Sequence, residues 1–203
     1  MMAAASATLR EEAAASRHSL LRVVTESLET VATQGCGLLI GIPMLAITAH
    51  WLGPQGRGIY VTTTTWAGLT ATCSGFSLGL VAIHELARSG GTDLDSLLGT
   101  LLAFAVGETL LAWSLIATAR LCGPQLFGDV TGAPLILGMA SIPFLIARDY
   151  LGSLLIATNR VPAWNRAQLA GTVASFLLVA GLAALALVTV ERIIMAWLCG
   201  VIL

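Results

Sequence analysis

Charged residues divide the chain into five long apolar runs: residues 30–56, 58–84, 96–119, 130–157 and 167–190. Three of these runs contain no Asp, Glu, Lys or Arg, the third along the chain contains only Glu108, and the fourth contains only Arg148 and Asp149. A membrane-spanning helix needs about 20 mostly apolar residues, so the pattern predicts five such helices. The runs lack the strict alternation of polar and apolar residues that is typical of outer-membrane barrel strands.

The last apolar stretch is shorter than the others. After Glu191 and Arg192 the chain ends in IIMAWLCGVIL. As a helix this stretch rises about 16 Å, roughly half of a hydrocarbon core. We expect a partial sixth helix in a chain that is incomplete at its C-terminus; a short interfacial or re-entrant tail is the alternative. The predicted fold class is an all-α, polytopic membrane helix bundle over residues 23–203, preceded by a cytoplasmic tail over residues 1–22.

The composition agrees with a membrane protein and excludes other classes. Of the 203 residues 57% are hydrophobic and 10% are charged, whereas an ordinary soluble domain is about 25% charged. A net charge of -1 without a basic stripe excludes a nucleic-acid-binding protein. The sequence has no metal-ligand spacing, GxSxG or Walker motif, so we expect no enzymatic activity, no metal site and no cofactor.

The distribution of arginine predicts the orientation in the membrane. With a cytoplasmic N-terminus, six Arg residues lie in cytoplasmic segments and three lie on the opposite side, which favours this orientation. Arg148 lies inside a predicted span and is left out of this comparison. Residues 86–95 and 159–166 are then cytoplasmic loops of a multi-pass protein.

Glycine and proline predict a sharp turn after the first span. In LGPQGRGIY, residues 52–60, Gly53 can end a helix in the left-handed region, and Pro54 cannot continue that helix. The first two spans should therefore form a hairpin. Two GxxxG pairs should allow close approach of helices: Gly37 with Gly41, and Gly75 with Gly79. Two prolines inside spans are expected to bend their helices: Pro43 and Pro143.

Three phrases of the sequence resemble a known family of transporters. They are LGPQGRGIY at 52–60, GLVAIHELARSG at 79–90 and YLGSLLIATNRVPAWN at 150–165. In this order they are similar to motifs of the multidrug/oligosaccharidyl-lipid/polysaccharide exporter superfamily, and most similar to its oligosaccharide flippases of the O-antigen type. The resemblance covers about residues 25–203. It implies that the chain is the N-terminal lobe of a two-lobed transporter in the bacterial inner (plasma) membrane.

Three ionisable residues lie inside predicted spans. If the third span begins near Leu97 and the fourth ends near Asn159, Glu108 and Arg148 each lie about 16 Å from the cytoplasmic side. Arg148 and Asp149 point about 100° apart on their helix. Charged residues inside spans usually face a bundle interior and mark substrate or proton pathways. We therefore regard Arg148, Asp149 and Glu108 as candidate substrate-binding or cavity residues.

The role of these charges is open between two alternatives. Arg148 is suited to bind a phosphate with its planar fork of donors, and the resemblance implies a lipid-linked substrate that carries a pyrophosphate. Alternatively, Arg148 forms a purely structural ion pair with Glu108 or with Asp149. The sequence favours neither role decisively.

Hydroxyl groups are concentrated at the start of the second span, in Thr62–Thr65. Such groups can form a wall that faces water or a polar ligand, and for this reason Thr63 and Thr64 are candidate cavity residues. They can equally be satisfied by the carbonyl groups of their own helix.

The function implied by the resemblance is the flipping of lipid-linked oligosaccharide across the membrane for polysaccharide biosynthesis. The partners would be this substrate, membrane lipid, a coupling ion, and a missing C-terminal lobe or a second copy. One alternative is a multidrug or lipid II exporter of the same superfamily. Others are a non-catalytic membrane scaffold protein and a membrane-embedded transferase, although the short loops disfavour the transferase.

Overall fold

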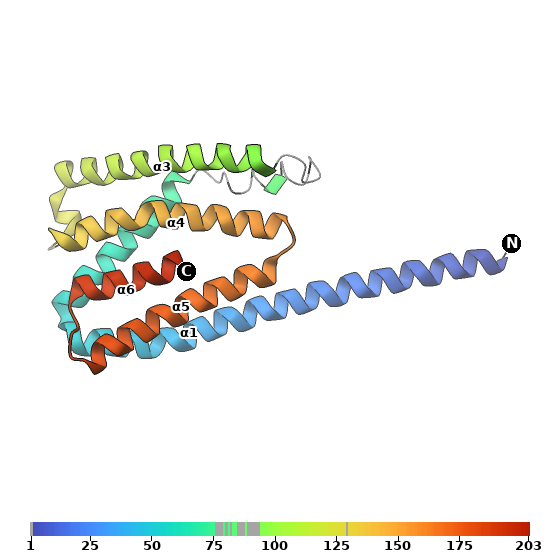
Figure 1. The fold of residues 1–203 in the computed structure, drawn as a ribbon, viewed down its shortest axis with the longest axis horizontal. Helices are drawn as coiled ribbons and strands as arrows, with labels where there is room; N and C mark the ends of the chain where they lie inside the picture. The colour runs from blue at the N-terminus through green and yellow to red at the C-terminus, as the bar shows by residue number, and fades with distance from the viewer. Residues whose placement is uncertain are drawn as a thin grey trace.

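The computed structural model describes the backbone of residues 2–75, 79, 81, 83–84, 88, 94–128 and 130–203, and most side chains from residue 24 onward. The described chain is all-α, as expected from its apolar runs. Long helices lie alongside one another, and the first part of α1 projects well beyond them (Figure 1). The elements are α1 (Met2–Ser74), α3 (Leu94–Cys122), the 3₁₀ turn η1 (Pro124–Phe127), α4 (Ala133–Ala157), α5 (Val161–Ala184) and α6 (Val190–Ile202).

A break at Gly53 divides α1 into two helical parts. Gly53 has φ 66° and ψ -176°, which interrupts the helical dihedrals of its neighbours. A left-handed φ is accessible to glycine without steric cost. The chain then turns back at an angle and crosses towards α3 (Figure 1). The predicted turn at Gly53 is therefore confirmed. Pro43 lies inside the first part, where the backbone stays helical, so the interruption of α1 is at Gly53 and not at this proline.

Four described helices are long and apolar enough to cross a membrane. They are the segments Ser27–Ser74 of α1, Ser96–Cys122 of α3, Ala133–Ala157 of α4 and Val161–Ala184 of α5. The first contains 48 residues, and the Gly53 break leaves roughly 30 Å of helix in residues 54–74. The end of the predicted second span, and most of the phrase at 79–90 and the loop at 86–95, lie outside the described residues. The chain is a multi-span membrane protein by these criteria.

The last helix, α6, is too short to span. Its 13 residues rise about 20 Å. Thr189 caps it, since the Thr189 hydroxyl accepts a hydrogen bond from the Arg192 backbone N–H at 3.4 Å. A helix shorter than a full span was predicted from the final apolar stretch.

Small residues allow α5 and α6 to pack closely. A methyl group added at Gly171 would overlap the backbone carbonyl oxygen of Gly200. The Ser175 hydroxyl donates a hydrogen bond to the Ala196 carbonyl oxygen at 3.1 Å. By contrast, no atom lies within 4 Å of a Cβ built at Gly37 or Gly41, so the predicted GxxxG pair makes no close helix contact in the described structure.

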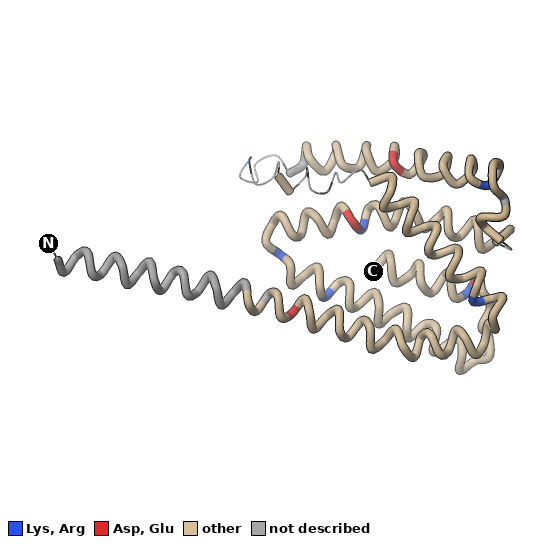
Figure 2. The backbone as a smooth tube through the Cα atoms, turned by 180° about the vertical axis from the view of Figure 1, so that it is seen from behind, with Lys and Arg blue, Asp and Glu red and all other residues tan. Residues whose placement is uncertain are grey.

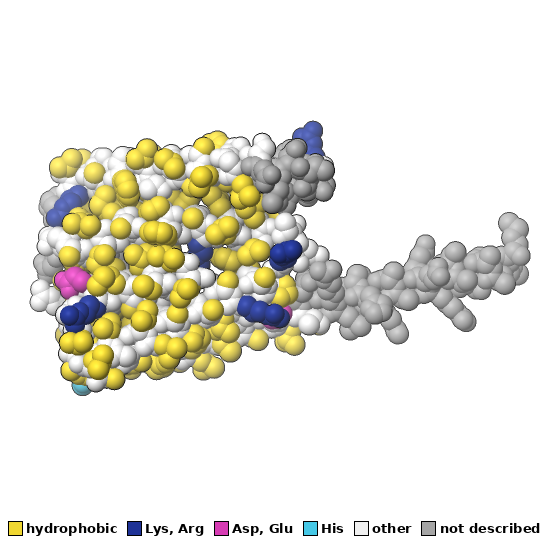
Figure 3. All heavy atoms as spheres, viewed as in Figure 1, with side chains coloured by type: hydrophobic (Ala, Val, Ile, Leu, Met, Phe, Trp, Pro, Cys, Tyr) yellow, Lys and Arg dark blue, Asp and Glu magenta, His cyan; other side chains and the backbone are white. Residues whose placement is uncertain are grey.

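The bundle is apolar outside as well as inside. Its main core joins α1, α3 and α4 around side chains such as Ala67, Ile116 and Ile142. Large hydrophobic side chains also lie on the surface, among them Leu102, which is 70% exposed. Hydrophobic groups cover much of the side of the bundle in Figure 3. Such an extensive apolar surface is what a lipid-facing protein presents, because a soluble monomer exposes much smaller apolar patches.

Charges and connections gather at the two ends of the bundle. Along the described helices, Figure 2 shows charged positions mostly near the ends, with few in the middle. The connection between α4 and α5 lies at the end from which α1 projects. The Gly53 break and the connection between α5 and α6 lie at the opposite end (Figure 1). This arrangement agrees with alternating loops on two sides of a membrane. The cytoplasmic location of the N-terminus stays a prediction.

Candidate functional site

A cavity of about 380 Å³, lined by apolar and polar groups, lies where α1, α3, α4 and α5 meet. Four separate helices contribute to its wall, so it is a feature of the assembled bundle. It contains two of the three charged residues that the sequence places inside spans. Its lining residues are Ala71, Thr72, Gly75, Gly79, Glu108, Ile146, Asp149, Tyr150, Gly152, Ser153, Ile156 and Trp164.

Glu108 is the most deeply enclosed charged residue of this cavity. Its side chain is 4% exposed, and its carboxylate lies beside the Tyr150 hydroxyl, although neither oxygen meets the geometric limits of a hydrogen bond. The preceding turns of α3 are apolar, so this helix supplies no compensating group. A buried acid without a basic partner is costly to keep in an apolar bundle. The carboxyl group of Glu108 lines the cavity with the Tyr150 hydroxyl beside it.

Asp149 and Tyr150 add two more polar groups from α4. Asp149 is exposed along the cavity, and its backbone carbonyl accepts a hydrogen bond from the Ser153 hydroxyl at 2.9 Å. Tyr150 is buried, and its hydroxyl lies beside the Glu108 carboxylate. The cavity thus contains two acids and a phenol, and the phenol is next to the more deeply buried acid.

Glycines allow the helices around the cavity to lie close together. A Cβ at Gly152 would lie 2.8–3.0 Å from three carbons of the Trp164 ring. A Cβ at Gly79 would overlap the Ser153 hydroxyl. Thus α5 comes close to α4 at Gly152, and the segment that contains Gly79 comes close to α4 at Ser153. The GxxxG pair of Gly75 and Gly79 borders the cavity.

Arg148 points to a different place from the two acids. Its guanidinium carbon lies 5.6 Å from the centre of the Trp164 ring. It lines a second cavity of about 260 Å³ together with Gln168, Phe144 and the end of α6. Trp164 lines both cavities.

The structural ion pair considered as one alternative for Arg148 is not seen in the described residues. The structure records no pair between Arg148 and either Glu108 or Asp149 there, and the polar neighbour of Glu108 is the Tyr150 hydroxyl. The expectation placed Glu108 and Arg148 at one level of the bundle, but a shared level does not bring two side chains together. Arg148 projects towards Trp164 instead.

The structure places Thr63 and Thr64 outside the acidic cavity. Thr63 is buried against α4, since its methyl carbon would lie 2.7 Å from a Cβ at Gly138. The Thr64 hydroxyl donates a hydrogen bond to the Tyr60 carbonyl oxygen at 3.0 Å. Thr64 is thus bonded to a carbonyl group of its own helix, one of the two alternatives given by the sequence. From the same hydroxyl-rich helix it is Thr72 that lines the cavity.

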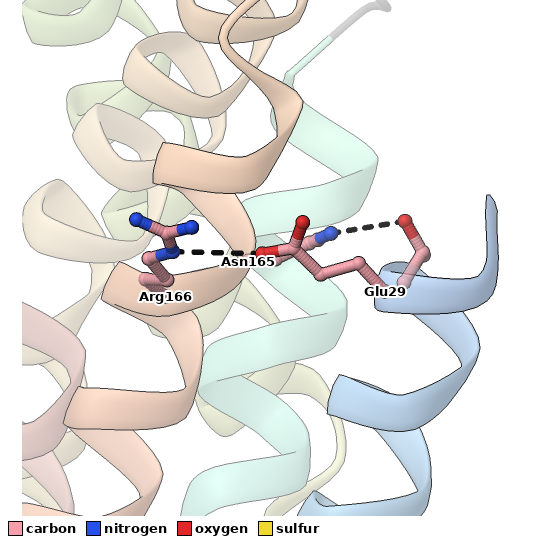
Figure 4. Close-up of polar contacts among 4 residues, drawn as sticks. Glu29, Asn165 and Arg166 are labelled. Carbon is pink, nitrogen blue, oxygen red and sulfur yellow. Dashed lines mark hydrogen bonds and ion pairs between the residues drawn. The ribbon is translucent and has the colours of Figure 1, made fainter. Parts of the chain in front are cut away.

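A polar contact also joins α1 to α5 near the end from which α1 projects. The Arg166 Nε lies 3.5 Å from Glu29 Oε1, and the Asn165 side-chain amide donates to the Thr30 hydroxyl at 2.9 Å. Figure 4 shows these pairs side by side between the two helices. Arg166 is largely exposed, so the ion pair itself adds little stability. The buried Asn165 makes the more specific link.

Sequence reasoning missed Tyr150 and Trp164 as cavity residues. An aromatic residue with a polar atom inside a span is a weak indication of a site, because such residues also occur in ordinary packing. Comparison of the chain with models of protein families, with curated proteins and with solved structures finds no match. The fold therefore has helices long and apolar enough for a multi-span membrane protein, and a cavity among them is lined by two acids and a phenol.

Proposed function

We propose that this chain is one lobe of a membrane transporter that flips lipid-linked oligosaccharide across the bacterial inner membrane. The observation that carries the transporter assignment is Glu108, an acid that is 4% exposed and has no basic partner among the described residues, on the wall of a cavity inside the bundle. Intramembrane acids of this kind typically belong to substrate or ion pathways. A lobe that only supported other proteins would have no need of such a group.

The chemistry of the cavity supports a sugar as part of the substrate. Carboxylates accept hydrogen bonds from hydroxyl groups, and Glu108 and Asp149 both line the cavity. Tyr150 and Trp164 add aromatic surface against which an apolar sugar face packs. A volume of about 380 Å³ lies within the usual range of small-molecule sites.

The neighbouring cavity supports a phosphate as a second part of the substrate. Arg148 lines it with Gln168, and Trp164 is shared with the cavity of the two acids. A guanidinium group binds phosphate oxygens through two parallel donors. A sugar in the acidic cavity and a pyrophosphate beside Arg148 would match a lipid-linked oligosaccharide. The transporter motif at residues 52–60 supports the same family.

Binding of the substrate class tests this proposal. A pyrophosphate-linked oligosaccharide lipid is titrated into the purified chain in detergent, and tryptophan fluorescence reports occupancy because Trp164 lines both cavities. We expect saturable binding that Glu108→Gln and Arg148→Gln each weaken at least tenfold. Glu29→Gln and Arg160→Gln, which remove charge at the end of the bundle, should leave it unchanged. Absence of binding, or equal effects of all four variants, would overturn the proposal.

A further inference from the structure

A groove between α1 and α5 shares no lining residue with the cavity of the two acids. It has a volume of about 380 Å³ and is lined by Thr33, Gln34, Gly37, Leu38, Gln168, Leu169 and Thr172. It begins just beyond the contact of Arg166 with Glu29 that Figure 4 shows, since Thr33 is one helical turn, about 6 Å, further along α1 than Glu29. This α1–α5 groove therefore lies within two candidate membrane spans.

The α1–α5 groove is lined by polar groups that are not bonded within the protein. The side-chain amides of Gln34 and Gln168 and the Thr33 hydroxyl make no hydrogen bond in the part of the chain that the structure describes. The Thr172 hydroxyl donates to the Gln168 carbonyl oxygen at 2.9 Å, and its own oxygen can still accept a hydrogen bond. Such groups are costly in a bilayer without a partner, because lipid tails offer none.

The hydrogen-bonding groups of the α1–α5 groove carry no charge. None of its lining residues is Asp, Glu, Lys, Arg or His, and Arg166 and Glu29 at its end are paired with each other at 3.5 Å. A phosphate or ammonium group in the groove would lose water without gaining an opposite charge. A group with several hydroxyls, such as a sugar, would instead exchange hydrogen bonds to water for bonds to the amides.

The surface beside the α1–α5 groove is apolar and faces outward. Leu38 lines the groove and is 75% exposed, and Ile42, one turn further along α1, is 65% exposed. No atom lies within 4 Å of a Cβ built at Gly37 or Gly41, so this face of α1 is open. An acyl chain can lie along this face while a headgroup occupies the groove. The combination favours a lipid over a free sugar, because a free sugar would leave the apolar face uncovered.

We infer that the α1–α5 groove binds a glycolipid with an uncharged sugar headgroup. The sugar hydroxyls bond to Gln34 and Gln168, and an acyl chain lies along Leu38 and Ile42. This lipid is a resident of the bundle surface that links α1 to α5, and it is not the translocated molecule. The inference does not rest on the proposed function, whose substrate carries a charged pyrophosphate beside Arg148.

Lipids that differ only in their headgroups test the inference. Monoglucosyl diacylglycerol, diacylglycerol and phosphatidylglycerol with identical acyl chains are titrated separately into the purified chain in a polyoxyethylene detergent, which carries no sugar. Native mass spectrometry measures the fraction of the chain that carries each lipid. We expect the glucosyl lipid to bind about tenfold more tightly than the other two, the effect of one or two hydrogen bonds. Free glucose at the same concentrations should not displace it.

Variants on α1 locate the site without changing the cavity of Arg148, which shares Gln168 with the groove. Gln34→Leu removes an amide at an exposed position, and Thr33→Val removes a hydroxyl; each should weaken binding of the glucosyl lipid about three- to tenfold. Gln125→Leu, at an exposed position of η1 outside the groove, is the matched control and should leave binding unchanged. Thermal unfolding confirms that each variant is folded. Gln34→Leu should also leave binding of the pyrophosphate-linked oligosaccharide unchanged, which separates this inference from the proposed function.

Four results would overturn the inference. Binding of diacylglycerol or phosphatidylglycerol as tight as that of the glucosyl lipid would show that the groove does not recognise an uncharged sugar. Displacement by free glucose would make it a site for a free sugar. Unchanged binding in both Gln34→Leu and Thr33→Val would place the lipid elsewhere. A dimer of the parent chain that Gln34→Leu dissociates, seen in the same mass spectra, would make the groove an interface between two copies.

Discussion

The guanidinium group of Arg148 lies over the ring of Trp164, 5.6 Å from its centre, and the same ring forms part of the wall around Glu108 and Asp149. One aromatic side chain from α5 therefore contacts the base of α4 and also lines the cavity of the two acids. Glu108 has no basic partner among the described residues, and its polar neighbour is the Tyr150 hydroxyl. It also gives the bundle two adjacent sites of opposite charge.

This geometry predicts that Arg148 and Glu108 contribute independently to stability. Arg148→Gln should cost about 0.5–2 kcal/mol, the value of a cation–π contact. Because no ion pair joins the two residues, the double change with Glu108→Gln should equal the sum of the single effects within about 0.5 kcal/mol. Chemical unfolding of the four proteins in detergent measures this. A double variant that recovers most of the stability lost in Arg148→Gln would indicate the structural ion pair after all.

Gly152 is predicted to be intolerant of even a methyl group. A Cβ there would lie 2.8–3.0 Å from the Trp164 ring, so Gly152→Ala must displace the ring that lines both cavities. We expect a loss of about 1–3 kcal/mol, as is usual for overpacking. The matched control is Gly181→Ala in α5, where no atom lies within 4 Å of the added carbon.

The control should be as stable as the parent, or up to about 1 kcal/mol more stable, since alanine restricts the unfolded chain. Thermal unfolding of both variants, with tryptophan fluorescence as a second readout, checks the difference. Equal stability of the two alanine variants would contradict the close contact of α4 with Trp164.

The contact between α5 and α6 gives a second packing prediction. Gly171→Ala would bring a methyl group into the Gly200 carbonyl oxygen, and a backbone atom cannot move aside as a flexible side chain can. We expect α6 to separate from α5, with faster proteolysis in residues 185–189 than in the parent. Gly107→Ala in α3, where the added carbon meets nothing within 4 Å, should leave the proteolysis rate unchanged. An unaffected Gly171→Ala protein would show that α6 does not dock as described.

The sequence predicts a feature of this fold when residues close together in the chain determine it, and fails when the packing of separate helices determines it. The break at Gly53 was predictable because glycine and proline in one short segment determine it. The bonding of the Thr64 hydroxyl to its own helix was one of two local alternatives. The contact of Arg148 with Trp164 was not predictable, because it depends on how α4 and α5 rotate against each other. Helical periodicity gives the direction of a side chain but does not identify the neighbour that it meets.

The predicted orientation can be tested with single cysteines. The four native cysteines are free and exposed, so they are first replaced by serine. Arg160→Cys, at the start of α5, should be protected from an impermeant thiol reagent in intact cells, while Gln125→Cys in η1 should react. After the cells are broken, both should react. Labelling of Arg160→Cys alone in intact cells would reverse the orientation deduced from the arginine distribution.

The central claim is that the cavity around Glu108 receives a ligand, and photo-crosslinking tests it most directly. A lipid-linked oligosaccharide with a diazirine on its sugar is irradiated with the purified chain, and mass spectrometry locates the attachment. The account predicts attachment within residues 149–153 and at Trp164, and its loss in Glu108→Gln but not in Glu29→Gln. Attachment confined to lipid-facing positions such as Leu102 and Ile136, in parent and variants alike, would contradict it.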